Sequence, residues 1–520
     1  MSFDVNRCLK SSWVWGFWAR LAVADQHITQ ALAESRLQAL VSGLPKMTLP
    51  WAFYNLALRF LSWGWVGVLV LCTFAETSLI ALGVWMMVLL SLVFARISAP
   101  NTPPNHSSAA FLSDYPKATF STIDLMVALF WACGMISTLA SSIQPASLNG
   151  AFKLTTMIAA YGGMRIVLGR AWPGPACLWA GALMALGGLQ GAIGLWQFQH
   201  HVLPLATWSD PTINPEIAIT RVFGTLKPLN PNLYAGFLLS TLPAVFLMAG
   251  FSVLKRRGVR RFFGIALSAL VMGFILFGLA MSGSRGGYLG LFASGLTAFA
   301  LLGYWLFVEG TGKTAAAFRK LWLGSGFLVT TGVVLLISLM PALRARILSI
   351  GAFWQDSSIA YRLQVYQTTW QMIQDNWLLG IGPGNETFRQ IFGAYAPAHL
   401  HALGAYSISL EILVELGLVG GVVALGFLIL IMLRSLMVIG NSAGAFESGK
   451  PAVGVLAADS VYFRRLHCLL ILVSGVAIMG VLANGLFDTV WYRPAVQIPF
   501  WLWVSILVSA SGQLIQVSDS

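Results

Sequence analysis

Charged side chains are scarce in this chain. Its 520 residues include 31 Lys and Arg and 18 Asp and Glu, together 9% of the sequence, whereas soluble domains carry about 25%. So few charges cannot cover the surface of a soluble protein of this size, which excludes a soluble enzyme or binding module. Runs of about twenty apolar residues recur instead, each long enough to cross the hydrocarbon core of a bilayer. The sequence therefore predicts an integral, multi-pass membrane protein in contact with membrane lipid.

Cysteine is also rare, and its spacing excludes two kinds of site. The five cysteines are scattered and form no CxxC or Cys/His pattern: Cys8, Cys72, Cys133, Cys177 and Cys468. Four of them lie in apolar stretches, as small buried side chains do. We therefore expect neither a disulfide framework nor a metal site, and the sequence indicates no cofactor.

Hydropathy predicts an all-α transmembrane bundle of about twelve spans. A basic, aromatic segment, residues 1–56, precedes them and is expected to lie on the cytoplasmic membrane surface or to form a partly disordered tail. Spans one to nine occupy 57–340, a large loop occupies 341–405, and spans ten to twelve occupy 406–520. The individual spans are 57–74, 78–97, 120–142, 149–168, 174–196, 231–254, 262–281, 287–307, 321–340, 406–434, 466–487 and 495–515.

The distribution of basic residues orients these spans. The net charge of +13 would suggest nucleic acid as a partner of a soluble protein, but cytoplasmic Lys and Arg explain the excess in a membrane protein. Dense basic clusters lie at 255–261, 313–320 and 450–465. With a cytoplasmic N-terminus, all three fall on one side. The loop 341–405 is then extracytoplasmic, in a plasma membrane or a thylakoid, and no nucleic-acid partner is expected.

The large loop is patterned enough to fold as a cap. Asp356-Ser357-Ser358 is a plausible helix start, and apolar residues then recur at helical spacing up to about Asn376. A glycine-rich turn follows, from Trp377 to Asn385. It is either a simple tight turn or a set of backbone N–H groups that receives an anion, which makes Asn385 a candidate binding residue.

Two histidines of the loop offer little chemistry by themselves. His399 and His401 are separated by one residue, and no carboxylate cluster accompanies them. This is poor spacing for metal ligands on a helix. Either could be a general base, but nothing adjacent orients it.

Charged residues at the ends of the predicted spans are candidate functional residues because intramembrane charge is costly. Arg285 lies in a short outer turn among small residues, where a guanidinium could grip phosphate or carboxylate in a bidentate manner. It could equally be an interfacial anchor. Glu411 and Glu415 lie one turn apart at the outer start of span ten. They could face a polar cavity or pair with arginines such as Arg285 or Arg362.

Several separated motifs resemble one known family. Arg221, Phe223, Gly224 and the stretch 229–232 fit its pattern, which makes Arg221 and Asn232 candidate binding residues. Four further segments carry the resemblance: SRGG at 284–287, YRLQVYQTTWQMIQDNWLLGIGPGNETF at 361–388, AYSISLEILVELGLVG at 405–420 and GLFDTVWYRP at 485–494. Together they look like the IctB family of cyanobacterial proteins, named for bicarbonate transport, within the O-antigen ligase and polymerase superfamily.

The resemblance implies a multi-pass fold with one large periplasmic loop. In ligases of this superfamily, arginines grip the diphosphate of a polyprenyl-linked glycan and a histidine activates the acceptor hydroxyl. The transfer is inverting and needs no metal. Arg285 matches the inner arginine motif and Arg362 matches the loop arginine. Glu411 and Glu415 are further candidates for contact with the substrate.

One position departs from the ligase pattern. Ligases carry a His-Asn pair just before the helix that follows the loop, where this chain has Tyr406 and Ser407. A tyrosine can donate a hydrogen bond but is a poor base at neutral pH, because its ordinary pKa is about 10. The expected catalytic set is therefore Arg285, Arg362, Tyr406 and Glu411. Three functions stay open: binding or transfer of a lipid-diphosphate-linked glycan, transport of bicarbonate or assistance to it, and a structural role in a membrane assembly with the basic N-terminal segment as the docking element.

Overall fold

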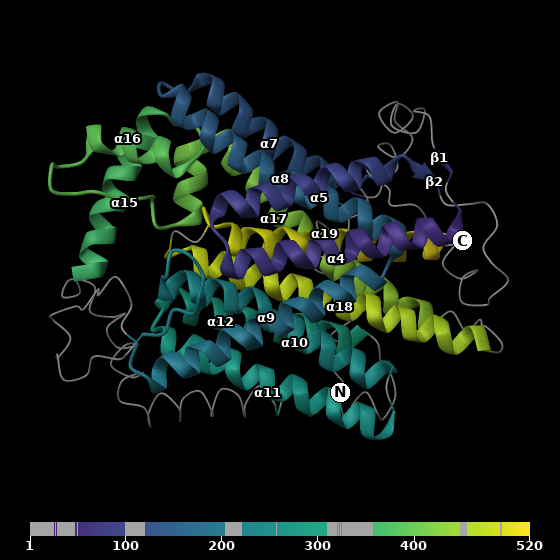
Figure 1. Ribbon diagram of the computed structural model, residues 1–520. Helices are drawn as coiled ribbons and strands as arrows, with labels where there is room; N and C mark the ends of the chain where they lie inside the picture. The colour runs from purple at the N-terminus through teal and green to yellow at the C-terminus, as the bar shows by residue number, and fades with distance from the viewer. Residues whose placement is uncertain are drawn as a thin grey trace, which may run out of the picture.

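The protein is a bundle of long helices with a small helical cap at one end. The computed structural model describes residues 25, 28, 47–48, 50–98, 120–202, 221–255, 257–308, 320, 322, 324, 357–447, 455–488 and 491–519. The bundle consists of α4 (Trp51–Phe74), α5 (Thr77–Ala95), α7 (Thr122–Ala140), α8 (Gln144–Ala171), α9 (Gly174–Gln199), α10 (Pro231–Lys255), α11 (Gly258–Ser282), α12 (Arg285–Val308), α17 (Ile408–Glu447), α18 (Val455–Gly485) and α19 (Pro494–Asp519). The cap holds α15 (Ser357–Asp375) and α16 (Asn385–Tyr395), and the C-terminus lies at the opposite end (Figure 1).

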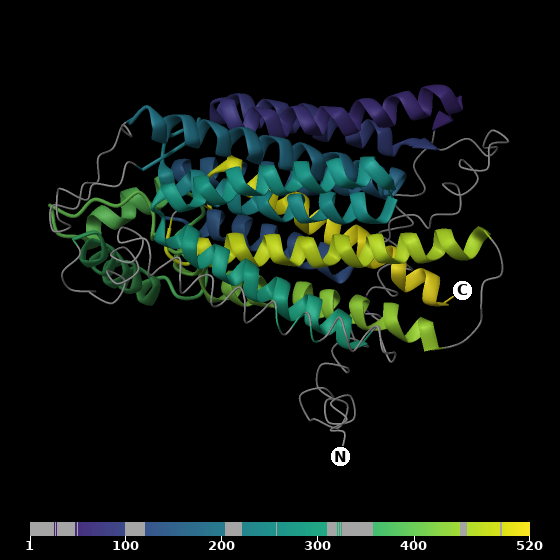
Figure 2. The ribbon, with the colours of Figure 1, turned by 90° about the horizontal axis from the view of Figure 1, so that it is seen from below.

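The all-α multi-pass prediction is confirmed. Ten of the described helices are long and apolar enough to cross a membrane, and they run side by side, with α4 and α5 along one edge (Figure 2). Each predicted span except 321–340, of which only residues 322 and 324 are described, coincides with a helix. The span predicted at 149–168 corresponds to α8, which carries several charged residues and is not among the ten. Two-residue strands, β1 (Met47–Thr48) and β2 (Ile97–Ser98), pair in parallel beside the bundle.

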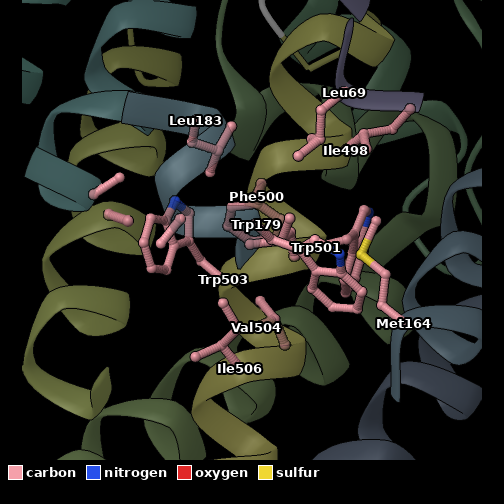
Figure 3. Close-up of a cluster of buried hydrophobic side chains, with 14 of the residues drawn as sticks. Leu69, Met164, Trp179, Leu183, Ile498, Phe500, Trp501, Trp503, Val504 and Ile506 are labelled. Atoms are coloured by element: carbon pink, nitrogen blue, oxygen red, sulfur yellow. The ribbon is translucent and has the colours of Figure 1, made fainter. Parts of the chain in front are cut away.

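The core of the bundle forms around α19. Its aromatic side chains, including Phe500, Trp501 and Trp503, are buried among residues of α4, α8 and α9 (Figure 3). The indole N–H of Trp503 donates to the carbonyl oxygen of Ser240 at 2.8 Å. A buried indole needs such a partner, so this bond fixes α19 against α10.

Small residues allow α12 and α18 to approach closely. A Cβ added at Gly290 would lie 2.7 Å from the carbonyl oxygen of Gly480, and one added at Gly480 would overlap the hydroxyl of Ser294. Gly286, one turn before Gly290, lies equally close to Asn484 of α18. This small-xxx-small spacing is the usual means by which membrane helices bring their backbones together. It places the first turn of α12 against the last turn of α18.

Helix α17 is broken at Gly417, whose φ of 64° and ψ of −168° are not helical. The glycine-rich turn that follows α15 fills the break. The N–H groups of Ile381 and Gly382 donate to the carbonyl oxygens of Val414 and Glu415 at 2.8 and 3.1 Å. Beyond the break, Leu418 and Val419 donate their N–H groups to the carbonyl oxygens of 377 and 378. The turn therefore satisfies the unpaired backbone groups of both halves of α17.

Buried ion pairs join helices at the end opposite the cap. The Arg434 guanidinium pairs with the Asp25 carboxylate at 2.7 Å, and both side chains are 1% exposed. Arg165 pairs with Asp124 at 3.1 Å, and the Arg165 guanidinium also donates to the hydroxyl of Ser509. Residues 1–56 were expected to lie on the cytoplasmic membrane surface or to form a partly disordered tail. Most of them lie outside the described residues, but Asp25 is buried within the bundle.

Candidate functional site

The candidate residues from the sequence gather at the cap end of the bundle. Four segments meet there: the turn between α11 and α12, the carboxyl end of α18, the first turn of α17, and α15. The close packing of α12 on α18 brings the first two together. The first turn of α17 and α15 both contact the carboxyl end of α18, because Ile408 of α17 contacts Gly485 and Arg362 of α15 contacts Phe487.

The turn before α12 positions Arg285 at the start of that helix. Gly283 adopts a left-handed conformation with φ of 60°, which ends α11. The Ser284 hydroxyl accepts the N–H of Gly287 at 3.1 Å and so caps α12. Arg285 is the first helical residue, and it is partly exposed. The short turn expected around Arg285 is therefore present.

Arg221 lies directly beside this turn. Its Nε donates to the carbonyl oxygen of Ser282 at 2.8 Å, and its terminal nitrogen donates to the side-chain oxygen of Asn232 at 2.8 Å. A Cβ at Gly283 would lie 3.2 Å from the Arg221 Nε, so a small residue is needed there. The candidate residues Arg221, before span six, and Asn232, in its first turn, thus contact each other and border the Arg285 turn.

Two buried glutamines of α9 hold the segment that carries Arg221. The Gln197 side-chain oxygen accepts the N–H groups of Phe223 and Gly224 at 3.0 and 2.9 Å, and its amide nitrogen donates to the Gly224 carbonyl. Gln190, two turns earlier, bonds in the same way to the N–H and hydroxyl of Thr225. These two glutamines are not among the residues predicted from the sequence. Two glutamines at a spacing of seven on an apolar helix were the available signal.

Arg362 lies between the cap and the carboxyl end of α18. Its guanidinium donates to the carbonyl oxygen of Phe487, and it lies 3.8 Å from the Asp488 carboxylate. It also lies over the Tyr406 ring, 5.8 Å from the centroid. A cation suits this place, because the carboxyl end of a helix carries partial negative charge. Arg285 and Arg362 therefore border the same end of α18.

Tyr406 occupies a strained position at the junction between the cap and α17. Its φ is 52°, which is uncommon for a residue other than glycine. Its ring packs edge-to-face against Tyr361, and its carbonyl oxygen accepts the Tyr366 hydroxyl at 3.1 Å. Burial, together with Tyr361, raises the pKa of Tyr406 above its ordinary value. At neutral pH its hydroxyl is a hydrogen-bond donor and not a base.

Glu411 and Glu415 lie on one face of α17 and are both buried. The Glu415 carboxylate accepts the Tyr492 hydroxyl and faces the backbone N–H of Gly384. Burial and then the charges of Glu415 and Glu411 raise the pKa of Tyr492. Burial raises the pKa of Tyr366, the Arg362 charge lowers it, and the charges of Asp488 and then Glu411 add to the rise. The two carboxylates thus have different surroundings: Glu415 bonds to Tyr492, whereas the Glu411 charge acts on both Tyr492 and Tyr366.

The glycine-rich turn has a structural use. Its N–H groups at 380, 381 and 382 all donate to backbone carbonyl oxygens. A Cβ at Gly150 of α8 would overlap the carbonyl of Pro383, so the turn is also pressed against α8. Asn385 follows as the first residue of α16. Of the two interpretations of this turn, the geometry favours the tight turn.

The two loop histidines lie on the surface of the cap. His399 and His401 are both exposed, and the backbone carbonyl of His401 accepts the Tyr361 hydroxyl. Within the described part of the chain, no group of three or more His, Cys, Asp and Glu residues could hold a metal ion.

One family model matches part of the chain. No curated protein matches the chain. Residues 270–425, which include Arg285, Arg362, Tyr406 and both glutamates, match the family model described as O-antigen ligase. This match supports a place for the chain in the O-antigen ligase superfamily.

Proposed function

We propose that this protein binds a lipid-diphosphate-linked glycan at the cap end of the bundle and transfers the glycan to an acceptor hydroxyl. The observation that carries the proposal is the position of Arg285 and Arg362 at one helix end, within the stretch that matches the O-antigen ligase model. Guanidinium groups bind phosphate oxygens in a bidentate manner. Two of them at one site suit a diphosphate.

The reaction would be a displacement at the anomeric carbon of the glycan. The acceptor oxygen forms a bond to that carbon, the bond from the carbon to the diphosphate oxygen breaks, and configuration inverts. The lipid diphosphate leaves with the electron pair. Arg285 and Arg362 would stabilise the charge that grows on the leaving oxygen, which is the usual role of fixed positive groups in such transfers.

A base must take the proton of the acceptor hydroxyl. Tyr406 stands where ligases carry a histidine, but burial raises its pKa, so it is protonated at neutral pH. Glu411 is a buried carboxylate in the first turn of α17, and its charge acts on Tyr366, whose hydroxyl donates to the Tyr406 carbonyl oxygen. We assign the proton to Glu411 and a donated hydrogen bond to Tyr406.

The glycan profile of a strain that lacks the protein tests this function. Complementation with the wild-type chain should restore one surface glycan, and Arg285→Ala or Arg362→Ala should not. Arg389→Ala is the matched control, since Arg389 is an exposed cap arginine paired with Glu386. An unchanged glycan profile in the deletion strain would overturn the proposal.

The finer resemblance, to the IctB family, suggests bicarbonate as the anion at the same arginines. Proteoliposomes that contain this protein alone decide between the two anions. Under the proposed function, they take up labelled bicarbonate no faster than empty vesicles. Uptake that depends on Arg285 and Arg362 would favour transport instead.

A further inference from the structure

Asn484 is an unusual residue of the cap end. It lies in the last turn of α18, its side chain is fully buried, and neither its amide oxygen nor its amide nitrogen has a hydrogen-bond partner among the described residues. A primary amide can donate two hydrogen bonds and accept two. Burying it without a partner is costly, so an asparagine in this place needs an explanation beyond packing.

The amide faces the first turn of α12. A Cβ added at Gly286 would lie 2.7 Å from the Asn484 side-chain oxygen and 2.9 Å from its carbonyl oxygen. Gly286 directly follows Arg285 at the start of a helix of 24 residues. The first N–H groups of any helix lack a carbonyl one turn earlier, and the helix dipole adds partial positive charge at that end.

These two features together describe an anion subsite. The amino end of a long helix attracts phosphate, and the Asn484 amide, which has no partner among the described residues, lies against the same turn and carries two N–H donors. The Arg285 side chain, which is partly exposed, begins on that turn and can close over a bound group. Leucine or alanine would fill the position of Asn484 without the cost of an unpaired amide.

We propose that Asn484 is a phosphate-binding residue, whose amide nitrogen donates to an oxygen of the substrate diphosphate at the amino end of α12. This inference rests on the proposed function, since it names a second kind of donor for the same diphosphate. The ligand reaches the amide as the Arg285 side chain moves onto the phosphate. The Asn484 amide, which has no partner among the described residues, then gains one.

Binding of farnesyl diphosphate to the purified full-length protein in detergent tests the role of Asn484. The variants Asn484→Leu and Asn484→Ala should bind this probe about tenfold or more weakly, as expected for the loss of one hydrogen bond to a charged group. The apparent Tm of Asn484→Leu should equal or exceed that of the wild type, because the variant removes an unpaired buried amide. Loss of affinity without loss of stability separates a ligand-binding role from a packing role.

Ser474→Ala is the matched control. Ser474 lies on the same helix, is fully buried, and also has a hydroxyl without a partner among the described residues. It is about 15 Å away from Asn484 along α18, so its variant should bind farnesyl diphosphate as the wild type does. Equal affinity of the wild type and both Asn484 variants would overturn the role of Asn484 and leave the proposed function standing. A wild-type protein that does not bind farnesyl diphosphate would overturn the proposed function itself.

Discussion

The backbone N–H of Leu418 donates to the carbonyl oxygen of Trp377 at 2.8 Å. This bond joins the glycine-rich turn of the cap to the middle of a membrane helix, at the point where α17 is broken. It is one of the bonds by which the turn replaces the missing helical bonds around Gly417. The cap is therefore tied to α17 well beyond its first turn, and Trp377 and Leu378, both exposed, continue the exposed apolar face of that helix. The position of Glu411 and Glu415 depends on this arrangement, because both lie between the junction and the break.

The first prediction concerns the break. Gly417→Ala should lower the stability of the protein by about 2 kcal/mol or more, because the residue has φ of 64° and an added Cβ would lie 2.3 Å from the Leu378 carbonyl oxygen. Thermal unfolding in detergent measures this effect. Gly393→Ala is the matched control: Gly393 lies in α16, and a Cβ there would have nothing within 4 Å. If both variants unfold at the wild-type temperature, the break is not held by the contact with the turn.

The sequence predicts the bundle well because the signal for a membrane span is local. Length and apolarity identify α4 or α10 without knowledge of any neighbour. The start of α15 at Ser357 and its end at Asp375 are equally local, since helical spacing and the following glycine turn mark them.

The site was only partly predictable because its remaining features depend on contacts between distant segments. Arg221 and Asn232 could be named from motifs, but their shared place beside Ser282 follows from the glutamines of α9. The break at Gly417 is visible only when 377–382 is placed against it. The sequence around Asn484 does not predict that its amide is buried without a partner among the described residues, because this results from the packing of α12 on α18.

A second prediction concerns the buried ion pair opposite the cap. Arg434→Met should destabilise the protein by about 3 kcal/mol, because it leaves the Asp25 carboxylate buried and unpaired. The double variant Asp25→Leu with Arg434→Met should recover most of that loss, since two apolar side chains can replace a buried pair. Thermal unfolding checks both. The exposed pair of Lys227 and Glu76 is the control, and Lys227→Met should cost less than about 1 kcal/mol. A double variant no more stable than Arg434→Met would contradict this account.

A third prediction separates chemistry from binding at Glu411. Glu411→Gln keeps the size of the side chain and removes its ability to accept a proton. Transfer of glycan from a polyprenyl diphosphate donor should fall about a hundredfold or more, and the affinity for farnesyl diphosphate should stay within about threefold of wild type. Glu386→Gln, on the exposed surface of α16, is the control and should leave both quantities unchanged. Equal loss of binding and transfer in Glu411→Gln would assign the residue to packing and not to proton transfer.

A fourth prediction concerns the geometry of Arg362. Arg362→Lys keeps the charge but loses the planar fork that spans the Phe487 carbonyl, the Asp488 carboxylate and the Tyr406 ring. Affinity for farnesyl diphosphate should fall about tenfold. Arg362→Ala should weaken it further. If the lysine variant binds as tightly as the wild type, charge alone suffices and bidentate recognition is excluded.

The last prediction is a pH dependence that belongs to Tyr406. Burial raises its pKa in the folded protein, whereas an unfolded tyrosine titrates near pH 10. Above about pH 10 the unfolded chain therefore loses this proton while the folded protein keeps it. The free energy of unfolding must then fall as pH rises above about 10, by about 1.4 kcal/mol per pH unit for each such proton. Below about pH 10, protonated Tyr406 contributes its full stabilisation to the folded protein. Tyr406→Phe removes one such proton. The apparent Tm of this variant should therefore decline less steeply than that of the wild type between about pH 9.5 and pH 11, which lie on either side of the ordinary tyrosine pKa of about 10. An unchanged slope would show that Tyr406 is open to solvent, and the ring could not then support Arg362 in the way that the structure indicates.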